Sequence, residues 1–200
     1  MPEAKKEFTR KMRAIAGDLF VFGCTVGLRY SDLKKLTAYN IENIGGKVYL
    51  VNLSQKTNTR TRVMLPEYAI DILSKYKTNN IQGALLPYPE LVSFNEKIKK
   101  LGEQAGWVHK IQKIRMRRGR PIEIKTKENK SFRFCDLLSS HCMRRTAIST
   151  LLRLGLEENL VRKISGHTPG SKEFYRYVEY SQSFMDEELT KIHLKFDKKC

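Results

Sequence analysis

Apolar side chains recur at helical spacing along most of the chain, and this periodicity constrains its fold most strongly. Between residues 7 and 26 they fall on one helical face, and Gly27 is placed to end that helix. Similar patterns predict helices over 67–75, 90–104, 140–155, 156–165 and 184–192, with a short one after Ser171. Only residues 47–65 show a clear β-hairpin, with a polar tip at 54–60. We therefore expect an α+β fold, mainly α with a small antiparallel β-sheet.

The charge balance restricts the kind of partner. The chain has 200 residues and a mass of 23.3 kDa, enough for a single domain over 1–200 with its own core. Lys and Arg number 38 and Asp and Glu 21, so the formal net charge is +17. Such an excess favours a polyanion, usually nucleic acid. Apolar residues make up 40%, too many for a disordered chain.

Targeting signals and metal-binding patterns are missing from the sequence. Residues 1–13 are charged and lack the apolar core of a signal peptide, and the apolar run 19–28 is about half a membrane span. The four cysteines form no CxxC pair and no Cys/His pair at zinc spacing. We expect a reduced, cytoplasmic protein without cofactor, metal or membrane contact.

Residues 109–133 differ in character from the rest. Ten of these 25 residues are Lys or Arg, against two Glu, and residues 121–125 alternate like a strand. The pattern indicates an exposed basic hairpin or loop that contacts a phosphate backbone. The candidate DNA-binding residues are Lys110, Lys113, Arg115, Arg117, Arg118 and Arg120.

Several residues further along could perform chemistry. His141 and Arg144 are three apart near a helix N-terminus, so both can reach one small anion. His167 follows a glycine just after the next helix, and a Tyr-rich turn with Tyr175 and Tyr177 comes soon after. Taken singly, each of these features is explained more simply by ordinary packing, capping or a chance surface pair.

Their order along the chain resembles the tyrosine recombinase, or phage integrase, family over about residues 10–190. The first arginine box resembles Gly27-Leu28-Arg29-Tyr30-Ser31-Asp32-Leu33, in which Ser31 is placed to cap a helix. The second resembles Ser140-His141-Cys142-Met143-Arg144-Arg145-Thr146. The last two boxes resemble Ile164-Ser165-Gly166-His167 and Phe174-Tyr175-Arg176-Tyr177-Val178. The second box and the basic insertion are most similar to integrases of conjugative and integrative elements.

The resemblance implies DNA cleavage through a 3′-phosphotyrosine without metal. Arg29 and Arg144 would neutralise the phosphate, since a guanidinium presents a planar fork of donors and stays charged. His141 and His167 would add donors or assist proton transfer. By the same resemblance, Lys56 on the hairpin tip would protonate the leaving 5′-oxygen, and Asp32 would orient the network.

The nucleophile has two candidates. Tyr175 lies 8 residues and Tyr177 10 residues after His167, and counting from the histidine does not choose between them. The Phe-x-Arg-Tyr-Val match favours Tyr177, with Tyr175 as the alternative.

The resemblance also bears on domains and partners. Relatives carry a separate core-binding domain ahead of the catalytic one, whereas only 28 residues precede Arg29, so we expect the catalytic domain alone. The expected partner is double-stranded DNA, on which the full-length protein would form a homotetramer at the bacterial nucleoid, whereas without DNA it would be a monomer. A C-terminal helix over 183–194 would pack in trans against a neighbouring protomer, with folding back onto its own core as the alternative. Two alternatives remain: DNA relaxation of the type IB topoisomerase kind, and a non-catalytic DNA-binding module.

Overall fold

The structure is a computed structural model that describes residues 2–54, 58–76, 83–168, 170–175, 177–178 and 182–197. Its helices are α1 (Pro2–Val26), α2 (Tyr30–Leu33), α3 (Glu67–Tyr76), α4 (Leu91–Gln104), α5 (Ser140–Arg153), α6 (Glu158–Ser165), α7 (Lys172–Tyr175) and α8 (Gln182–Asp197), with 3-10 turns η1 (Ala38–Asn40) and η2 (Phe134–Leu137). Its strands are β1 (Ile41–Ile44), β2 (Lys47–Leu53), β3 (Arg60–Met64), β4 (Lys110–Ile111), β5 (Lys113–Arg117), β6 (Arg120–Ile124) and β7 (Phe132–Arg133). The predicted α+β class is confirmed.

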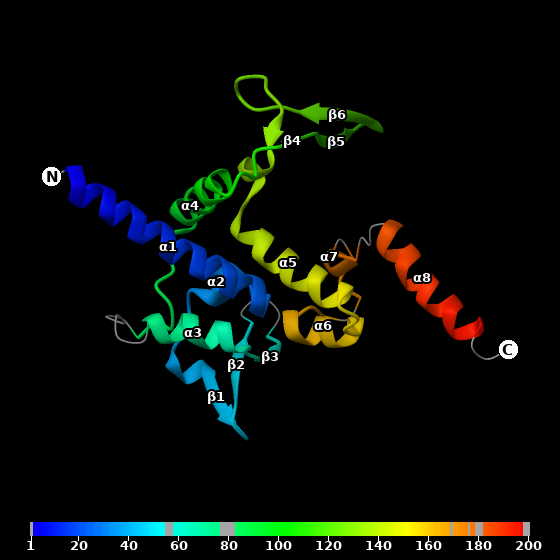
Figure 1. The fold of residues 1–200 in the computed structure, drawn as a ribbon, viewed down its shortest axis with the longest axis horizontal. Helices are drawn as coiled ribbons and strands as arrows, with labels where there is room; N and C mark the ends of the chain where they lie inside the picture. Colours follow the sequence, from blue (N-terminus) through cyan, green and yellow to red (C-terminus); the bar gives the residue numbers. More distant parts are fainter. Residues whose placement is uncertain are drawn as a thin grey trace.

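Helix α1 supplies the centre of the main hydrophobic core. Its residues Leu19, Phe22 and Val26 are three and four positions apart, so they share one face, and all three are fully buried. Helices α3, α4 and α5 pack around α1 (Figure 1). A second, smaller cluster lies between α5, α6 and α7, and it includes Phe174 and Tyr177. The groups that could carry chemistry lie where these two clusters meet.

The predicted hairpin is part of a three-stranded antiparallel sheet in the order β1-β2-β3. Leu50 on β2 lies opposite Val63 on β3, and both are buried against the helices. Strand β1 was not predicted, because its four residues do not alternate in polarity. It pairs with β2 in antiparallel register. Gly45 and Gly46, which both have positive φ, form the two-residue turn that joins the two strands.

The basic segment folds as two antiparallel strand pairs, β4 with β7 and β5 with β6. Strands β5 and β6 are joined by Arg118 and Gly119, both at positive φ, as a tight two-residue turn requires. This ribbon projects away from the helices (Figure 1), and β5 is exposed along its whole length.

One expected helix start is wrong. Ser31 does not cap a helix, because α2 begins at Tyr30 and Arg29 occupies the N-cap position. Asp32 lies in the first turn of α2, as expected, but its side chain is buried. The corner after Gly27 is therefore tighter than the sequence suggests, and it turns the Arg29 side chain toward the sheet.

Helix α8 stands apart from the other helices at the C-terminal end (Figure 1). Its apolar residues Met185, Leu189, Ile192 and Leu194 are 41 to 55% exposed, so this helix does not fold back onto the core. None of the described helices is both long and apolar enough to cross a membrane.

Helices α1 and α5 pack closely at Gly23. A Cβ there would overlap the Sδ of Met143 and lie 3.2 Å from its Cβ, and Met143 is fully buried. At Gly17, on the same helix, a Cβ would meet only the Cδ1 of Leu101, at 3.8 Å, an ordinary contact.

Alanine should therefore act in opposite directions at these two glycines. We predict that Gly23→Ala lowers the free energy of unfolding by about 1–2 kcal/mol, because overpacking outweighs the gain in helix propensity. Gly17→Ala should raise it by about 0.5–1 kcal/mol. Urea denaturation of both variants measures the difference. Equal shifts in one direction would show that the helices do not approach at Gly23.

Candidate active site

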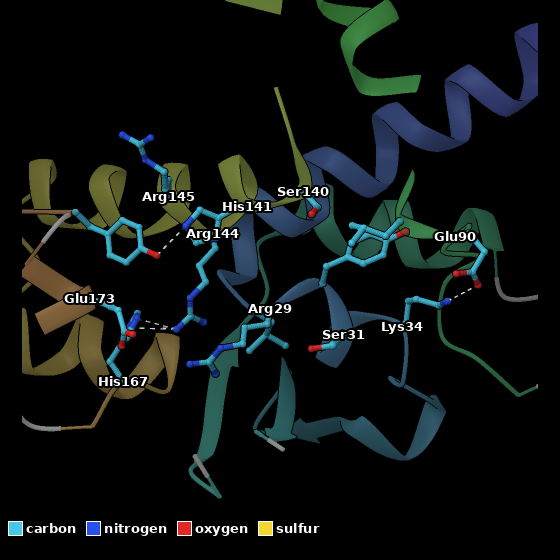
Figure 2. A pocket seen from close by; sticks show the side chains of 14 residues that line it. Arg29, Ser31, Lys34, Glu90, Ser140, His141, Arg144, Arg145, His167 and Glu173 are labelled. Carbon is cyan, nitrogen blue, oxygen red and sulfur yellow. Dashed lines mark hydrogen bonds and ion pairs between the residues drawn. The ribbon is translucent and has the colours of Figure 1, made fainter. Parts of the chain in front are cut away.

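A cavity of about 930 Å³ opens between the α2 corner, the start of α5, the Gly-His turn after α6 and the turn after α7 (Figure 2). Five residues singled out in the sequence line it: Arg29, His141, Arg144, His167 and Tyr177. They come from four separate segments, so folding alone brings them together. Among the described residues, no three His, Cys, Asp or Glu side chains are grouped as a metal site requires.

Arg29 is held by the sheet. Its Nη1 donates a hydrogen bond to the Oγ of Ser54, at 2.9 Å, and Ser54 is buried at the end of β2. Gly27, two residues earlier, has a φ of +67° and makes the sharp turn out of α1. The guanidinium consequently lies on the wall of the cavity, on the same side as Arg144 (Figure 2).

Arg144 is the more deeply buried cation, with 3% of its surface exposed. Its Nη1 donates to the backbone oxygen of Gly27 at 2.9 Å, which ties α5 to the end of α1. Burial, and next the charge of Arg29, lower the pKa of Arg144 to about 10, while Tyr177 and Asp32 act in the opposite direction. The guanidinium remains charged at neutral pH and faces the cavity.

His167 is a neutral partner of that cation. Its Nε2 lies 3.0 Å from the Nη2 of Arg144, and its Nδ1 lies 2.8 Å from the Oγ of Ser165. Burial lowers the pKa of His167 to about 3, and the charges of Arg144 and Arg29 add to this effect. Because Arg144 can only donate, the ring nitrogen facing it must be an acceptor.

Tyr177 and His141 form a pair across the cavity. The Tyr177 hydroxyl lies 3.1 Å from the Nε2 of His141, and the Tyr177 side chain is largely buried. Burial, followed by the charges of Arg144 and Arg145, lowers the pKa of His141. A neutral imidazole at this distance can accept the phenolic proton, which is the geometry of a nucleophile with its general base.

Tyr175 is placed differently from Tyr177. It is 55% exposed and does not line the cavity. Its ring lies 4.9 Å from the guanidinium carbon of Arg162, which also stacks 4.0 Å from the ring centre of Phe174. Arg162 is buried and ion-paired with Glu158, so it fixes the short helix α7 that precedes Tyr177.

The other candidate residues are not at the cavity. Lys56 lies outside the described residues. Asp32 is buried near Arg144 without lining the cavity. The candidate DNA-binding residues do not line it either, because they are on exposed parts of the strands of the basic segment or, for Arg118, in the turn between β5 and β6: Lys110, Lys113, Arg115, Arg117, Arg118 and Arg120.

Sequence patterns did not single out several polar residues at this site, among them Lys34 and Glu90, which line the cavity. Ser54 anchors Arg29, Ser165 contacts His167, and Arg145 and Glu173 line the cavity. Ser165 offered a signal, since a serine two positions before the Gly-His histidine can reach its ring. Ser54 offered none, because its contact depends on how the sheet packs against the α2 corner.

The low pKa of His167 should make stability depend on pH. The histidine of the unfolded chain has a pKa near 6.5, whereas that of the folded protein is about 3. Between these two pH values the unfolded chain binds more protons than the folded protein, so the free energy of unfolding decreases as the pH is lowered. We predict a loss of about 2 kcal/mol in the free energy of unfolding from His167 between pH 7 and pH 5. Urea denaturation at both pH values measures it. The variant His167→Gln should lose distinctly less, and an equal loss in both proteins would contradict the prediction.

Sequence comparison finds no relative, whereas structural comparison does. No protein-family model matches the chain, and no curated protein matches it. XerA recombinase superposes with a TM-score of 0.59 at 19% identity, covering 94% of this chain and 60% of its own. XerH site-specific recombinase bound to difH substrate, in a post-cleavage complex, gives a TM-score of 0.60 at 13% identity, covering 88% and 45%.

A transposon protein matches as well. The Tn1549 transposon integrase, in complex with a circular intermediate DNA, has a TM-score of 0.57 at 15% identity and covers 96% of this chain and 64% of its own. The chain thus spans between 45 and 64% of the lengths of these three proteins. At identities this low the structural similarity shows the fold alone. The chemistry has to be argued from the residues of the site. The chain has the α+β fold of a tyrosine recombinase catalytic domain, shared with Xer recombinases and a mobile-element integrase.

Proposed function

We propose that this protein is the catalytic domain of a site-specific DNA recombinase or integrase that cleaves and rejoins DNA through a 3′-phosphotyrosine. One observation carries the proposal: the Tyr177 hydroxyl is hydrogen-bonded to His141 in a cavity that also holds the guanidiniums of Arg29 and Arg144. A non-catalytic DNA-binding module of the same fold has no use for such an arrangement. Neighbours in the structural comparison were determined with DNA, which supports a DNA substrate.

A phosphodiester in the cavity would lie between the two arginines. Each guanidinium can donate two parallel hydrogen bonds to non-bridging oxygens, which neutralises charge on the phosphate. Because Arg144 is already desolvated and anchored, it stabilises developing negative charge without first reorganising. Arg145 and Lys34 also line the cavity, so the phosphate enters a positive environment.

Cleavage would begin at Tyr177. Its oxygen attacks phosphorus as its proton passes to the Nε2 of His141, and the bond from phosphorus to the 5′-oxygen breaks. That oxygen then needs a proton, which we assign to Lys56. Ser54 supports this assignment, because it contacts Arg29 from the same β2–β3 connection that carries Lys56. Rejoining follows the reverse path, with the 5′-hydroxyl attacking the phosphotyrosine.

DNA outside the cavity would contact the basic ribbon. Strands β5 and β6 are exposed and carry Lys113, Arg115, Arg117 and Arg120 on one face, because alternate residues of a strand point the same way. We assign these residues to the phosphate backbone, where contacts position the protein without reading sequence.

Assembly would use α8. Its exposed apolar residues need a covering surface, and none of the described elements provides one. We assign that surface to a neighbouring protomer in a tetramer on two duplexes, with a monomer expected in the absence of DNA. Sedimentation with and without DNA tests this arrangement, and a monomer on synapsed DNA would contradict it.

The nucleophile is tested with paired tyrosine variants. We predict that Tyr177→Phe abolishes the covalent protein–DNA adduct on a nicked suicide duplex and leaves non-covalent binding unchanged, because only the attacking oxygen is removed. Tyr175→Phe is the matched control and should still form adduct, since its ring contacts Arg162 outside the cavity. Denaturing gels and mobility shifts measure the two effects. An adduct that survives in Tyr177→Phe and disappears in Tyr175→Phe would reverse the assignment.

A separate assay distinguishes the alternative activity. Relaxation of supercoiled DNA at catalytic protein levels would favour a topoisomerase.

The leaving-group proton is tested at Lys56. We predict that Lys56→Ala slows cleavage of an ordinary phosphodiester by roughly 10²–10⁴-fold, the scale of general acid catalysis. A 5′-bridging phosphorothiolate should restore most of the rate, because a thiolate leaves without protonation. Lys47→Ala, at the opposite end of strand β2, is the control and should cleave normally. An equally deep loss on both substrates would mean that Lys56 only positions DNA.

A further inference from the structure

A continuous chain of buried hydrogen bonds supports Arg144 from behind. It begins at the backbone oxygen of Val161, which accepts from the Oγ of Ser165 at 2.7 Å. It continues through His167, whose Nδ1 lies 2.8 Å from that Oγ. The Nη2 of Arg144 lies 3.0 Å from the Nε2 of this ring and 3.2 Å from its Nδ1, so Nε2 is the nearer nitrogen. It ends where the Nη1 of Arg144 donates to the backbone oxygen of Gly27. Ser165, His167 and Arg144 are each at most 8% exposed.

The direction of each hydrogen bond follows from the two ends of this chain of hydrogen bonds, because the backbone oxygen of Val161 can only accept and the guanidinium of Arg144 can only donate. Ser165 has one hydroxyl proton, and the short distance to the oxygen of Val161 places that proton there. Only the lone pairs of Ser165 then face His167, so Nδ1 must carry the ring proton. The Nε2 of a neutral ring is consequently left with a lone pair, which accepts from Arg144. The opposite tautomer would remove the lone pair from the ring nitrogen that is nearer to Nη2.

We propose that Ser165 is a positioning residue that holds His167 in its Nδ1–H tautomer and thereby orients Arg144. The histidine acts as a rigid acceptor behind the guanidinium and does not carry charge itself. Its effect on DNA cleavage rests on the proposed function, whereas the tautomer is a property of the folded protein alone.

Arg144 needs such support because it is a buried cation. A guanidinium has five N–H donors, and each one left without a partner in the interior is costly. Gly27 and His167 accept one hydrogen bond each, at Nη1 and Nη2, which sets the plane of the group. Tyr177 also hydrogen-bonds to this guanidinium, which holds the group beside the proposed nucleophile. An Nε2–H tautomer would remove the acceptor nearest to Nη2 and so weaken this support.

The tautomer can be read directly by NMR. Long-range proton–nitrogen correlation distinguishes protonated from unprotonated ring nitrogens, and the signals of His167 are assigned by comparison with His167→Gln. At pH 7 we expect the protein to show Nδ1 protonated and Nε2 unprotonated. An Nε2–H tautomer or a doubly protonated ring would overturn the proposal, and this measurement needs no substitution at Ser165.

Substitution then tests the role of the hydroxyl. We expect Ser165→Ala to shift His167 toward Nε2–H, because the acceptor for Nδ1–H is removed, and Ser165→Thr to restore the original tautomer. Ser74→Ala is the matched control, since Ser74 donates the same bond to an oxygen four residues back, Ile70, on the exposed side of α3. An unchanged tautomer in Ser165→Ala would contradict the proposal.

Cleavage gives the functional readout. We expect adduct formation to slow by roughly tenfold in Ser165→Ala, with DNA binding retained, and to recover in Ser165→Thr. If the tautomer shifts as expected and the adduct forms at the original rate, the positioning role is wrong. If the unsubstituted protein forms no adduct at all, the proposed function fails, while the tautomer measurement still decides the part of Ser165.

Discussion

The burial of one guanidinium, that of Arg144, is the constraint on which the candidate site depends. A charged group can remain in a protein interior only where its donors are hydrogen-bonded and nearby charge is balanced. Arg144 meets this condition with partners from three places, namely Gly27 at the end of α1, His167 after α6, and the carboxylate of Asp32 in α2 nearby. Any movement of these segments relative to α5 leaves a donor unpaired. The requirement to satisfy one cation therefore holds the walls of the cavity together.

Packing and polarity cooperate in placing the reactive hydroxyl. The ring of Tyr177 packs in the smaller hydrophobic cluster of α5, α6 and α7, whereas its hydroxyl is hydrogen-bonded to His141 at the cavity. Arg162, stacked on Phe174, fixes the helix just before it. The ring thus has little freedom, and the oxygen is held by apolar contacts that are not themselves reactive.

The positive charge of the chain is divided in space. Part of it lies inside the cavity, where burial, and next the charge of Arg29, lower the pKa of Arg144. Another part lies on the ribbon of β5 and β6, which projects away from the helices (Figure 1) and contributes no residue to the cavity. Solvent screens the ribbon charges, which suits them to binding an extended polyanion. The buried pair is suited to a single phosphate.

Sequence patterns predicted the helices, the hairpin and five of the residues that line the cavity, because helical and alternating periodicity report which face is buried, and because four short motifs stood in a distinctive order. They did not determine β1, whose residues do not alternate, nor that Arg29 rather than Ser31 stands at the start of α2. Tertiary structure alone decided that Tyr177 faces the cavity while Tyr175 faces Arg162, and that Ser54 and Ser165 support the site. The physical reason is that local patterns describe one element at a time. Hydrogen bonds between elements depend on how those elements cross, which is set by contacts between residues far apart in the chain.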